Sequence, residues 1–404
     1  MARGDPRIMI SAGEDSGDLH GASLAREASA RGLGLRFFGL GGDRMREAGV
    51  RLLAHSRETA VMGISEVLAQ AGRLWRLRER LAEAAVSERP DALVLIDSPD
   101  FNFRLARRAS AAGIPVVYYV CPQIWAWRAG RIRFLARHTR RRCLILPFEK
   151  AFYESRGVPA DFVGHPLLDE MAPRPRDEAR AGLPLPREGP LLALLPGSRP
   201  GVFARLAPAV FGAASLLLAA RTDLVAAAAL APGLPGELAD RALSGVPASL
   251  RPRLITFRGR SREILNAAEA AILASGTSAV EAAILGTPAV VCYRASPLSY
   301  LAARLLVRTC HISIPNLILG RALLPELIQG DATPERIAAA AGPLLEGGAG
   351  RRGALAGLAE VASALGGPGA SGRVLDIILE EAGRAGGRGS ADPSGEAGRG
   401  KETR

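Results

Sequence analysis

The stretch Ala270-Ala-Ile-Leu-Ala-Ser-Gly-Thr-Ser-Ala-Val-Glu281 contains the pattern on which the fold prediction depends. Residues 270–273 are apolar and predict a short buried strand, and the small residues after them predict a tight loop that opens a helix. A buried strand that leads directly into a helix is typical of βαβ units, which build parallel sheets. If the pattern repeats along the chain, the fold is α/β.

The pattern does repeat, because short apolar runs alternate with longer stretches of helical periodicity in both halves of the sequence. The strand candidates are residues 7–12, 35–40, 92–96, 116–120, 143–146, 161–163, 191–195, 224–230, 253–256, 270–273 and 289–292. A Pro- and Arg-rich stretch around Met171 separates the first six from the last five and indicates a linker. We therefore predict two tandem Rossmann-like domains with an interdomain cleft and a helical C-terminal region. The expected boundaries are 1–172, 173–382 with trailing helices, and a disordered tail at 383–404.

Composition narrows the class of protein. The chain has 404 residues, which suits two domains, and its 48% apolar content excludes a disordered chain. No uninterrupted apolar run reaches the length of a membrane span, and residues 1–10 read as a first strand rather than a secretory signal. The four cysteines show no C-x-x-C pairing and suit reduced, mostly buried thiols, so we expect a cytoplasmic protein.

The positive charge is concentrated in one segment. The formal net charge is +12, and residues 101–148 contribute +10 of it with ten arginines and no acid. Such a segment is expected to meet polyanions, which include nucleic acid, an anionic membrane surface and a phosphorylated substrate. The alternative is a compositional bias towards arginine, with solvated side chains.

In open parallel sheets, ligands bind beyond the carboxyl ends of the strands, so the residues after each strand are the candidate site residues. The first strand leads into an acidic loop, Gly13-Glu-Asp-Ser-Gly-Asp18. Its carboxylates would repel a diphosphate and suit hydroxyl recognition, which makes Glu14 a catalytic candidate. An N-cap role for Ser16 or Asp18 is an equally weighted alternative.

A second acidic turn, Asp97-Ser-Pro-Asp100, follows strand 92–96. A carboxylate at a strand end, beside a turn stiffened by proline, is well placed to act as a general base, and Asp97 is our candidate. The alternative is that Asp97 or Asp100 caps the next helix.

The strand at 116–120 leads into a loop that holds two of the three tryptophans. Trp125 and Trp127, with Arg128 and Arg131 after them, predict sugar or acyl contact, and packing is the alternative.

Two loops of the second domain predict a diphosphate site. Pro196-Gly-Ser-Arg199 follows strand 191–195, and its amides, hydroxyl and guanidinium suit phosphate oxygens, although an ordinary turn has the same composition. The loop of the opening stretch can bind a diphosphate at a helix N-terminus, and Glu281 could reach a ribose diol. The alternative is a capping box between Glu281 and Ser278. The donor-site candidates are Gly197, Ser198, Arg199, Ser275, Gly276, Thr277, Ser278 and Glu281.

Metal-site patterns are lacking, since no Asp-x-Asp, H-E-x-x-H or paired-cysteine motif occurs. We expect no metal and no cofactor, so arginine and helix-terminal amides would neutralise a leaving diphosphate.

Residues 65–89 carry an apolar helical stripe through Val67, Leu68, Leu74 and Trp75. An interfacial tryptophan on such a stripe suits docking to a membrane surface, and packing on the first sheet is an equally weighted alternative.

Together these segments resemble the lipid-A-disaccharide synthase family of GT-B-fold glycosyltransferases over about residues 7 to 345. The matching stretches, in family order, are Ala12-Gly-Glu-Asp-Ser-Gly-Asp18, Ala60-Val-Met-Gly-Ile64, Ile96-Asp-Ser-Pro-Asp-Phe-Asn102, Pro122-Gln-Ile-Trp-Ala-Trp-Arg128, Leu146-Pro-Phe-Glu-Lys150, Val163-Gly-His-Pro166, Leu195-Pro-Gly-Ser-Arg199, Ala274-Ser-Gly-Thr-Ser-Ala-Val-Glu281 and Ile314-Pro-Asn316. One departure is visible, because the family commonly carries an acid where this chain has Val202.

The resemblance implies an inverting transfer of 2,3-diacylglucosamine from its UDP donor to lipid X (2,3-diacylglucosamine 1-phosphate), which yields the β-1,6 disaccharide and UDP. It implies that Asp97 is the base, that Arg199 and the 275–278 loop meet the diphosphate, and that Asn316 is an active-site residue. It also implies that Met62 and the stripe after it contact acyl chains or an anionic membrane, with a peripheral location on the inner face of the inner membrane.

Two other functions were weighed against this one. Another GT-B UDP-sugar enzyme, an epimerase or N-acetylglucosaminyltransferase, would share Glu281 but not the Asp97 or Trp125 segments. A nucleic-acid-binding protein is disfavoured because no recognisable binding module is present. The sequence leaves the oligomeric state open, with a homodimer among the alternatives. The place of the helices after Pro334 is also left open: they stay with the second domain, return to the first, as GT-B chains often do, or exchange between subunits.

Overall fold

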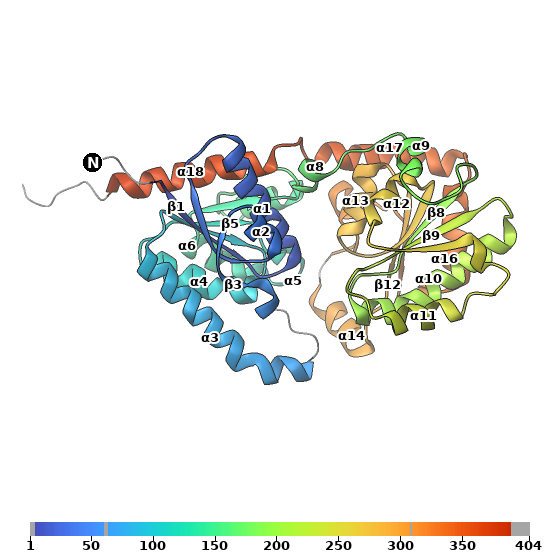
Figure 1. Ribbon diagram of the computed structural model, residues 1–404, viewed down its shortest axis with the longest axis horizontal. Coiled ribbons are helices and arrows are strands. Elements are labelled where there is room, and N and C mark those ends of the chain that lie inside the picture. Colours follow the sequence, from blue (N-terminus) through green and yellow to red (C-terminus); the bar gives the residue numbers. More distant parts are fainter. Residues whose placement is uncertain (1–4, 60–63, 308, 389–404) are drawn as a thin grey trace, which may run out of the picture. The chain divides into compact units, whose positions relative to one another are not determined.

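The computed structural model describes residues 5–59, 64–307 and 309–388, which form two compact units. Unit 1 comprises Met1–Pro166 together with Pro368–Arg404, and unit 2 comprises Leu167–Gly367. Each unit is built on one parallel sheet with helices on both faces (Figure 1). The prediction of two Rossmann-like domains is therefore confirmed.

The sheet of unit 1 has seven parallel strands in the order β3-β2-β1-β4-β5-β6-β7. Its strands are β1 (Arg7–Ala12), β2 (Arg36–Gly41), β3 (Arg51–His55), β4 (Ala92–Ile96), β5 (Val116–Tyr119), β6 (Arg141–Leu144) and β7 (Asp161–Phe162). Its helices are α1 (Asp15–Ala30), α2 (Asp43–Glu47), α3 (Ile64–Glu88), α4 (Pro99–Ala111), α5 (Ile124–Trp127), α6 (Ile132–His138), α7 (Pro147–Glu154) and α18 (Ala370–Arg388).

Alternate residues of these strands face two separate cores. Met9, Leu93 and Leu95 pack with residues of α3, α4 and α6 on one face of the sheet. Ile8 and Ile10 pack with residues of α1 and α18 on the other. Because both faces are covered, a central strand such as β4 is apolar throughout, which is why its sequence could be recognised as a continuous run.

Helix α18 returns to unit 1 after the chain has completed unit 2. It lies along α1, its Asp376 pairs with Arg31 at 2.7 Å, and Arg373 donates to the carbonyl oxygen of Val163 (Figure 1). Val374 and Ile378 are fully buried in the same core as Ile8. The predicted boundary at 382 is thus wrong, because this apolar helix face completes the first core, and the linker lies at 166–167. Residues 383–388 of the predicted tail are helical, and 389–404 lie outside the described residues.

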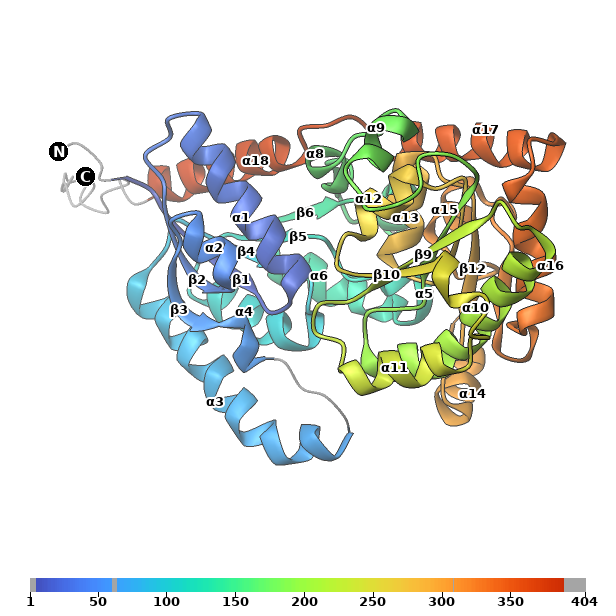
Figure 2. The same cartoon turned by 45° about the vertical axis from the view of Figure 1, so that its right-hand side comes forward.

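The sheet of unit 2 has six parallel strands in the order β10-β9-β8-β11-β12-β13. Its strands are β8 (Leu191–Leu195), β9 (Val225–Leu230), β10 (Leu254–Arg258), β11 (Ala270–Ala274), β12 (Ala289–Tyr293) and β13 (Glu326–Ile328). Its helices are α8 (Leu167–Glu170), α9 (Arg176–Ala181), α10 (Pro200–Ala220), α11 (Gly236–Ser244), α12 (Ser261–Ala267), α13 (Thr277–Leu285), α14 (Pro297–Leu306), α15 (Ile314–Leu319), α16 (Pro334–Leu345) and α17 (Ala349–Ala364). Helices α10 and α16 lie on the opposite side of this sheet from α12 and α13 (Figure 2).

Among the described helices, α10 is the one that is long and apolar enough to cross a membrane. Arg205 interrupts the apolar sequence of this helix, so no uninterrupted apolar run of spanning length is present. Phe203, Leu206 and Val210 are fully buried in the core of unit 2, as in a core helix of a globular domain.

In each sheet the chain adds strands first on one side of the starting strand and then on the other, and this switch point indicates where ligands bind. In unit 1 the chain passes from β1 to β2 on one side and later returns to β4 on the other. In unit 2 the same reversal occurs between β8 and β11. Ligands of open α/β sheets bind at the carboxyl ends of the strands that flank such a reversal. Glu14 and Asp97 follow β1 and β4, while Arg199 and Ser275 follow β8 and β11.

Candidate active site

The turn after β4 holds Asp97 in an unusual backbone conformation. Asp97 and Ser98 have φ of 46° and 44°, in the left-handed region that costs non-glycine residues about 1–3 kcal/mol each. Hydrogen bonds compensate for this strain, because the Asp97 carbonyl oxygen accepts from Tyr118 Oη at 2.7 Å and from Asn102 Nδ2 at 2.8 Å. Such strain is common where a side chain must be presented at a functional site.

The helix-cap alternatives for this turn are not observed. The N-cap of α4 is Ser98, and it makes no side-chain capping bond. The Asp100 carboxylate instead contacts Arg131 at 2.7 Å and Arg128 at 3.6 Å. Asp97 itself lines a cavity of about 270 Å³ at the carboxyl edge of the sheet.

Asn102 is a site residue that sequence reasoning missed. It is fully buried, accepts from Ser11 Oγ at 2.7 Å, and donates to the carbonyl oxygens of Ile96 and Asp97. It therefore ties the ends of β1 and β4 together beneath Asp97. The available signal was an asparagine in the first turns of α4 between Phe101 and Phe103.

In the acidic loop after β1, Glu14 and Asp18 differ in their surroundings. Glu14 is exposed at the N-cap of α1. The preceding residue, Gly13, packs closely on Ser98, since a Cβ atom at position 13 would lie 3.3 Å from Ser98 Oγ. Asp18 is buried and accepts from the amides of Gly42, Arg44 and Met45 at 2.6–3.1 Å. Asp18 thus anchors the start of α2, so Glu14 and Asp15 are the exposed carboxylates of this loop.

The two tryptophans near the Asp97 cavity play different parts. Trp125 is half-buried, packs edge-on against Phe148 and donates to Glu149 Oε1 at 3.0 Å, as the packing alternative predicts. Trp127 is 45% exposed and lines the cavity with Arg128 and Arg131. Only Trp127 is therefore available for substrate contact.

Glu149 forms part of the wall of the same cavity and is almost completely buried. Its carboxylate accepts from Trp125 and from the Leu146 amide at 3.2 Å. Burial nevertheless raises the pKa of Glu149 to about 7, because these bonds only partly replace hydration of the charge. The sequence showed this residue as part of a matching stretch without a role.

In unit 2, both glycine-containing loops and Glu281 line one cavity of about 410 Å³. Its lining includes every donor-site candidate from the sequence, Gly197, Ser198, Arg199, Ser275, Gly276, Thr277, Ser278 and Glu281. Gly276 has φ 156° and ψ −157°, a combination that is essentially restricted to glycine. Since the N-termini of α10 and α13 both begin in these loops, their amide dipoles favour an anion here.

Glu281 does not form the predicted capping box. Its Oε1 accepts from Arg262 Nε at 2.9 Å, and Arg262 also binds Glu170 at 2.9 Å. Ser278 Oγ donates to the Ala274 carbonyl oxygen instead. Glu281 is therefore oriented by Arg262 and lines the cavity, as a ribose-binding carboxylate should.

Asn316 is fully buried and lies outside the cavity lining. Its amide oxygen accepts from the amides of Leu323 and Leu324, and its nitrogen donates to Leu324 and Glu326. Since these bonds use its full hydrogen-bonding capacity, Asn316 is a positioning residue in this structure rather than one that touches substrate.

A chain of hydrogen bonds connects Asn316 to the donor cavity through Glu326. The Glu326 carboxylate accepts from the amides of Ile312 and Ser313, and the Ile312 carbonyl accepts from Ser275 Oγ at 3.2 Å. Neither Glu326 nor this relay was apparent from sequence, because the partners are brought together only by the fold.

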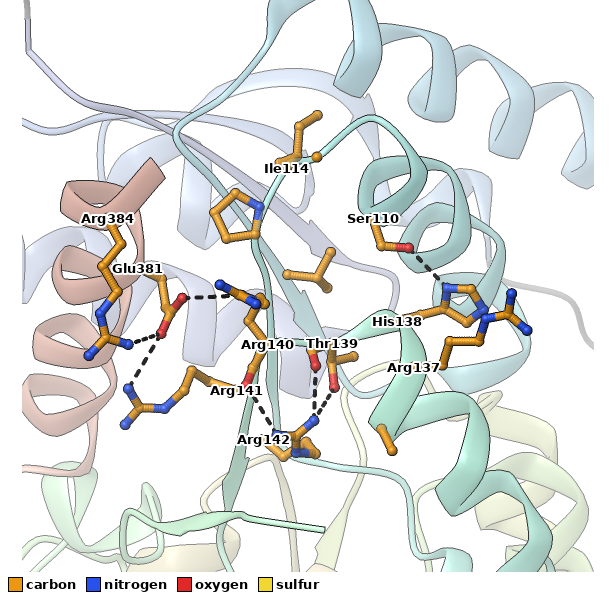
Figure 3. Close-up of a pocket in the computed structure, with 14 residues that line it drawn as sticks. Ser110, Ile114, Arg137, His138, Thr139, Arg140, Arg141, Arg142, Glu381 and Arg384 are labelled. Carbon is orange, nitrogen blue, oxygen red and sulfur yellow. Dashed lines mark hydrogen bonds and ion pairs between the residues drawn. The ribbon is translucent and has the colours of Figure 1, made fainter. Parts of the chain in front are cut away.

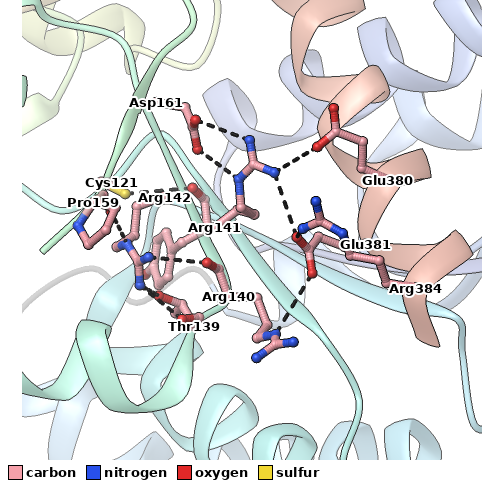
Figure 4. A network of polar contacts seen from close by, with 11 residues as sticks. Cys121, Thr139, Arg140, Arg141, Arg142, Pro159, Asp161, Glu380, Glu381 and Arg384 are labelled. Carbon is pink, nitrogen blue, oxygen red and sulfur yellow. Dashed lines mark hydrogen bonds and ion pairs between the residues drawn. The ribbon is translucent and has the colours of Figure 1, made fainter. Parts of the chain in front are cut away.

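Acids from elsewhere in unit 1 neutralise much of the arginine segment at 101–148. Arg104 pairs with Glu79, and Arg128 and Arg131 pair with Asp100. Arg140 pairs with Glu381, and Arg141 pairs with Asp161, Glu380 and Glu381 (Figure 4). Arg142 is buried and donates to backbone carbonyls, including that of Pro159. In the described part of the chain, no carboxylate lies at ion-pair distance from Arg107, Arg108, Arg133 or Arg137.

Several of these arginines also lie at the wrong edge of the sheet for the substrate. Arg137, Arg140, Arg141 and Arg142 line a cavity of about 780 Å³ at the amino ends of β5 and β6, where Figure 3 shows Glu381 between Arg140 and Arg384. Asp97 lies at the carboxyl ends. Of the ten arginines of this segment, Arg128 and Arg131 line the Asp97 cavity, so the segment does not face that cavity as a whole. The expectation that it meets a polyanion stays a prediction.

Helix α3 is partly a core helix. Leu77, Leu81 and Ala85 are buried against the sheet, whereas Trp75 is 54% exposed and Leu74 is half-buried. Met62 lies outside the described residues, as do the side chains of Val67 and Leu68.

In the described residues, no cluster of three His, Cys, Asp or Glu side chains could hold a metal ion.

Comparison with known proteins identifies the family. The family model for lipid-A-disaccharide synthetase matches residues 8–360. The chain belongs to the lipid-A-disaccharide synthetase family. The lipid-A-disaccharide synthase of Geobacter sulfurreducens is 45% identical over 94% of this chain and 98% of its own length. The synthase of Myxococcus xanthus is 44% identical over 93% and 97%, respectively.

Solved structures support the fold at much lower identity. The UDP-GlcNAc 2-epimerase of Neisseria meningitidis, bound to UDP-GlcNAc, has a TM-score of 0.62 at 10% identity and covers 93% of this chain and 99% of its own. A calicheamicin glycosyltransferase has a TM-score of 0.58 at 17% identity, with 94% and 99% covered. This chain therefore shares its fold with both of these proteins.

Proposed function

We propose that this member of the family transfers 2,3-diacylglucosamine from UDP-2,3-diacylglucosamine to the 6-hydroxyl of lipid X, releasing UDP. The observation that supports the donor assignment is the single cavity that gathers Arg199, the 275–278 loop and Glu281. Charged and amide donors in one loop cluster suit a diphosphate, and a carboxylate nearby suits a ribose.

The proposed chemistry is a single displacement with inversion. Asp97 accepts the proton of the acceptor 6-hydroxyl as its oxygen bonds to the sugar C1, and the bond from C1 to the diphosphate oxygen breaks. The electron pair leaves with UDP. Arg199 and the amides of α10 and α13 stabilise the charge that develops there, so the step is proposed to need no metal and no cofactor.

The proposed partners include an anionic membrane surface, because both substrates carry acyl chains. The exposed Trp75 of α3 and the arginines that lack a carboxylate partner support peripheral association with the inner face of the inner membrane from the cytoplasm. The Trp127 and Arg128 wall supports binding of lipid X beside Asp97. A homodimer is one alternative for the assembly of the protein, and sedimentation would distinguish it from a monomer.

A two-substrate assay tests the proposal. Purified protein should release UDP only when UDP-2,3-diacylglucosamine and lipid X are both present, and EDTA should not lower the rate. UDP release with the donor alone would indicate a different UDP-sugar enzyme, such as an epimerase or hydrolase. Loss of activity with EDTA would refute the metal-independent step.

A further inference from the structure

Helix α14 of unit 2 is apolar but not buried. Leu301, Leu305 and Leu306 are 58%, 78% and 52% exposed, and Val307 after them is 39% exposed. None of the side chains described in this helix is buried. Half of the large apolar side chains that are exposed in the described part of the chain therefore lie in this short stretch.

The helix is held firmly at both ends. Before it, Arg294 donates to the Ala332 carbonyl oxygen and the Ala295 amide donates to Gln329. After it, Glu326 binds the amides of Ile312 and Ser313. The Ile312 carbonyl oxygen also accepts from Ser275, so the segment after α14 is tied to the donor loop. Figure 1 shows α14 at the margin of unit 2.

Contact of this apolar face with water would not stabilise such a helix. A helix of ten residues is marginal in isolation, and most helical stability in proteins comes from a buried apolar face. Exposed apolar side chains gathered in one place mark a surface that another phase or partner covers.

The charge pattern indicates which partner. Arg304 is exposed and lies one turn from Leu301 on the same side of α14. In the described residues no carboxylate lies at ion-pair distance from Arg304, whereas Arg321 is paired with Glu360. Apolar side chains combined with arginine and without acids suit the interface of an anionic bilayer.

We propose that α14 is a second membrane-contact helix, which inserts Leu301 and Leu305 into the headgroup region of an anionic bilayer next to the donor cavity. The inference rests on the proposed function in one respect, because an acylated donor must be drawn from a membrane. It differs from that proposal in assigning membrane contact to the donor-binding unit.

The test compares the full-length protein with L301Q/L305Q. Both side chains are exposed and glutamine favours helix, so the melting temperature should not change. Partition onto vesicles of phosphatidylcholine and phosphatidylglycerol should weaken roughly tenfold or more, since two leucines no longer leave water. L216Q removes another exposed leucine of the same unit, on α10, and should leave partition unchanged.

A charge variant tests the lipid specificity. R304Q should lower partition onto the mixed vesicles by about fivefold and have little effect on pure phosphatidylcholine, which carries no net charge. Equal partition of L301Q/L305Q and wild type overturns the proposal. A loss of dimer in sedimentation with unchanged vesicle partition also overturns it, because the face would then be a self-association surface.

Turnover with both substrates in detergent micelles separates this inference from the proposed function. L301Q/L305Q should match wild type there, because neither leucine lines the donor cavity. If wild type itself forms no disaccharide, the proposed function fails, while the vesicle comparison still decides the role of α14.

Discussion

Replacement of Glu149 by glutamine should make the first unit less sensitive to pH. The Glu149 carboxyl is buried beside Trp125, and in the described residues no cation lies at ion-pair distance from it. The groups that face it are the Trp125 indole, the Leu146 amide, and the buried Cys121 and Tyr153. Glutamine keeps the acceptor for Trp125 and cannot ionise, so it resembles the protonated acid.

The magnitude follows from the pKa. Burial raises the pKa of Glu149 from 4.5 to about 7, and each tenfold change in proton affinity is worth about 1.4 kcal/mol, so ionisation costs the folded state about 3 kcal/mol. The folded state binds the proton more tightly than the unfolded state. The stabilising contribution is therefore fully present below pH 4.5 and is lost as the pH rises through about 7.

Urea unfolding followed by tryptophan fluorescence is the appropriate assay. All three tryptophans, at 75, 125 and 127, lie in unit 1, so their emission reports the unfolding of that unit. Between about pH 5 and about pH 8.5, the free energy of unfolding of E149Q should rise relative to wild type by up to about 3 kcal/mol.

Glu154 on the same helix provides the control, because its side chain is 55% exposed. E154Q should follow the pH dependence of wild type. If the difference between E149Q and wild type is the same at every pH, the buried carboxylate does not titrate in this range and the reasoning fails.

Four further predictions concern residues that line the two cavities or support the loops near them. Asp97→Asn should lower turnover by roughly 10²–10⁴-fold while UDP affinity in calorimetry is unchanged, whereas near-normal turnover would remove Asp97 as the base. Gly197→Ala places a Cβ 2.8 Å from Val202 Cγ1 at φ 116°, so UDP should bind roughly tenfold or more weakly, and Val202→Ala in the same chain should recover part of the loss. Asp18→Asn replaces an acceptor of three amides and should cost about 1–3 kcal/mol, visible as a lower melting temperature with little effect on UDP affinity. Asn316→Ala should weaken UDP binding as well as turnover, because Asn316 acts through Ser275, and a loss of turnover alone would contradict that relay.

The elements that could be predicted from sequence are those whose own residues carry the signal. Strands buried on both faces, such as β4 and β8, appear as apolar runs, and their bounds were predicted correctly. The strands β3 and β13 were missed because each lies at a sheet edge, is short and is mostly half-buried. Such strands lack both a continuous apolar run and a strict alternation.

Contacts between distant segments could not be predicted from sequence. The return of α18 to unit 1 depends on Arg31 and Arg373, whose partners are 345 and 210 residues away. The same limit applies to the charge of the arginine segment. Residues 101–148 contain no acid, yet Glu79, Asp161 and Glu381 approach them in the fold. Net charge over a sequence window therefore overstates the field that a ligand meets.

The positions of residues that follow strand ends could be predicted because topology fixes them. Parallel strands bring their carboxyl ends to one edge, so Arg199 and Ser275 line one cavity although 76 positions separate them in the sequence. Topology does not decide what each side chain then does. Asp18 lies just after β1 and yet uses its carboxylate within the protein. Asn316, which only the family resemblance implied, also uses its polar atoms within the protein.

The valine at 202 shows how such a site tolerates a departure from its family. Val202 lines the donor cavity and packs against Gly197, where a Cβ would lie 2.8 Å from its Cγ1. An apolar side chain thus supports the Pro196–Arg199 turn by contact, a role that an acid could fill by charge. In the described residues, no carboxylate lies at ion-pair distance from Arg199, whereas Glu281 is already paired with Arg262. The loss of the acid therefore leaves the guanidinium of Arg199 fully available to a diphosphate, so Val202→Glu should weaken UDP binding rather than restore it.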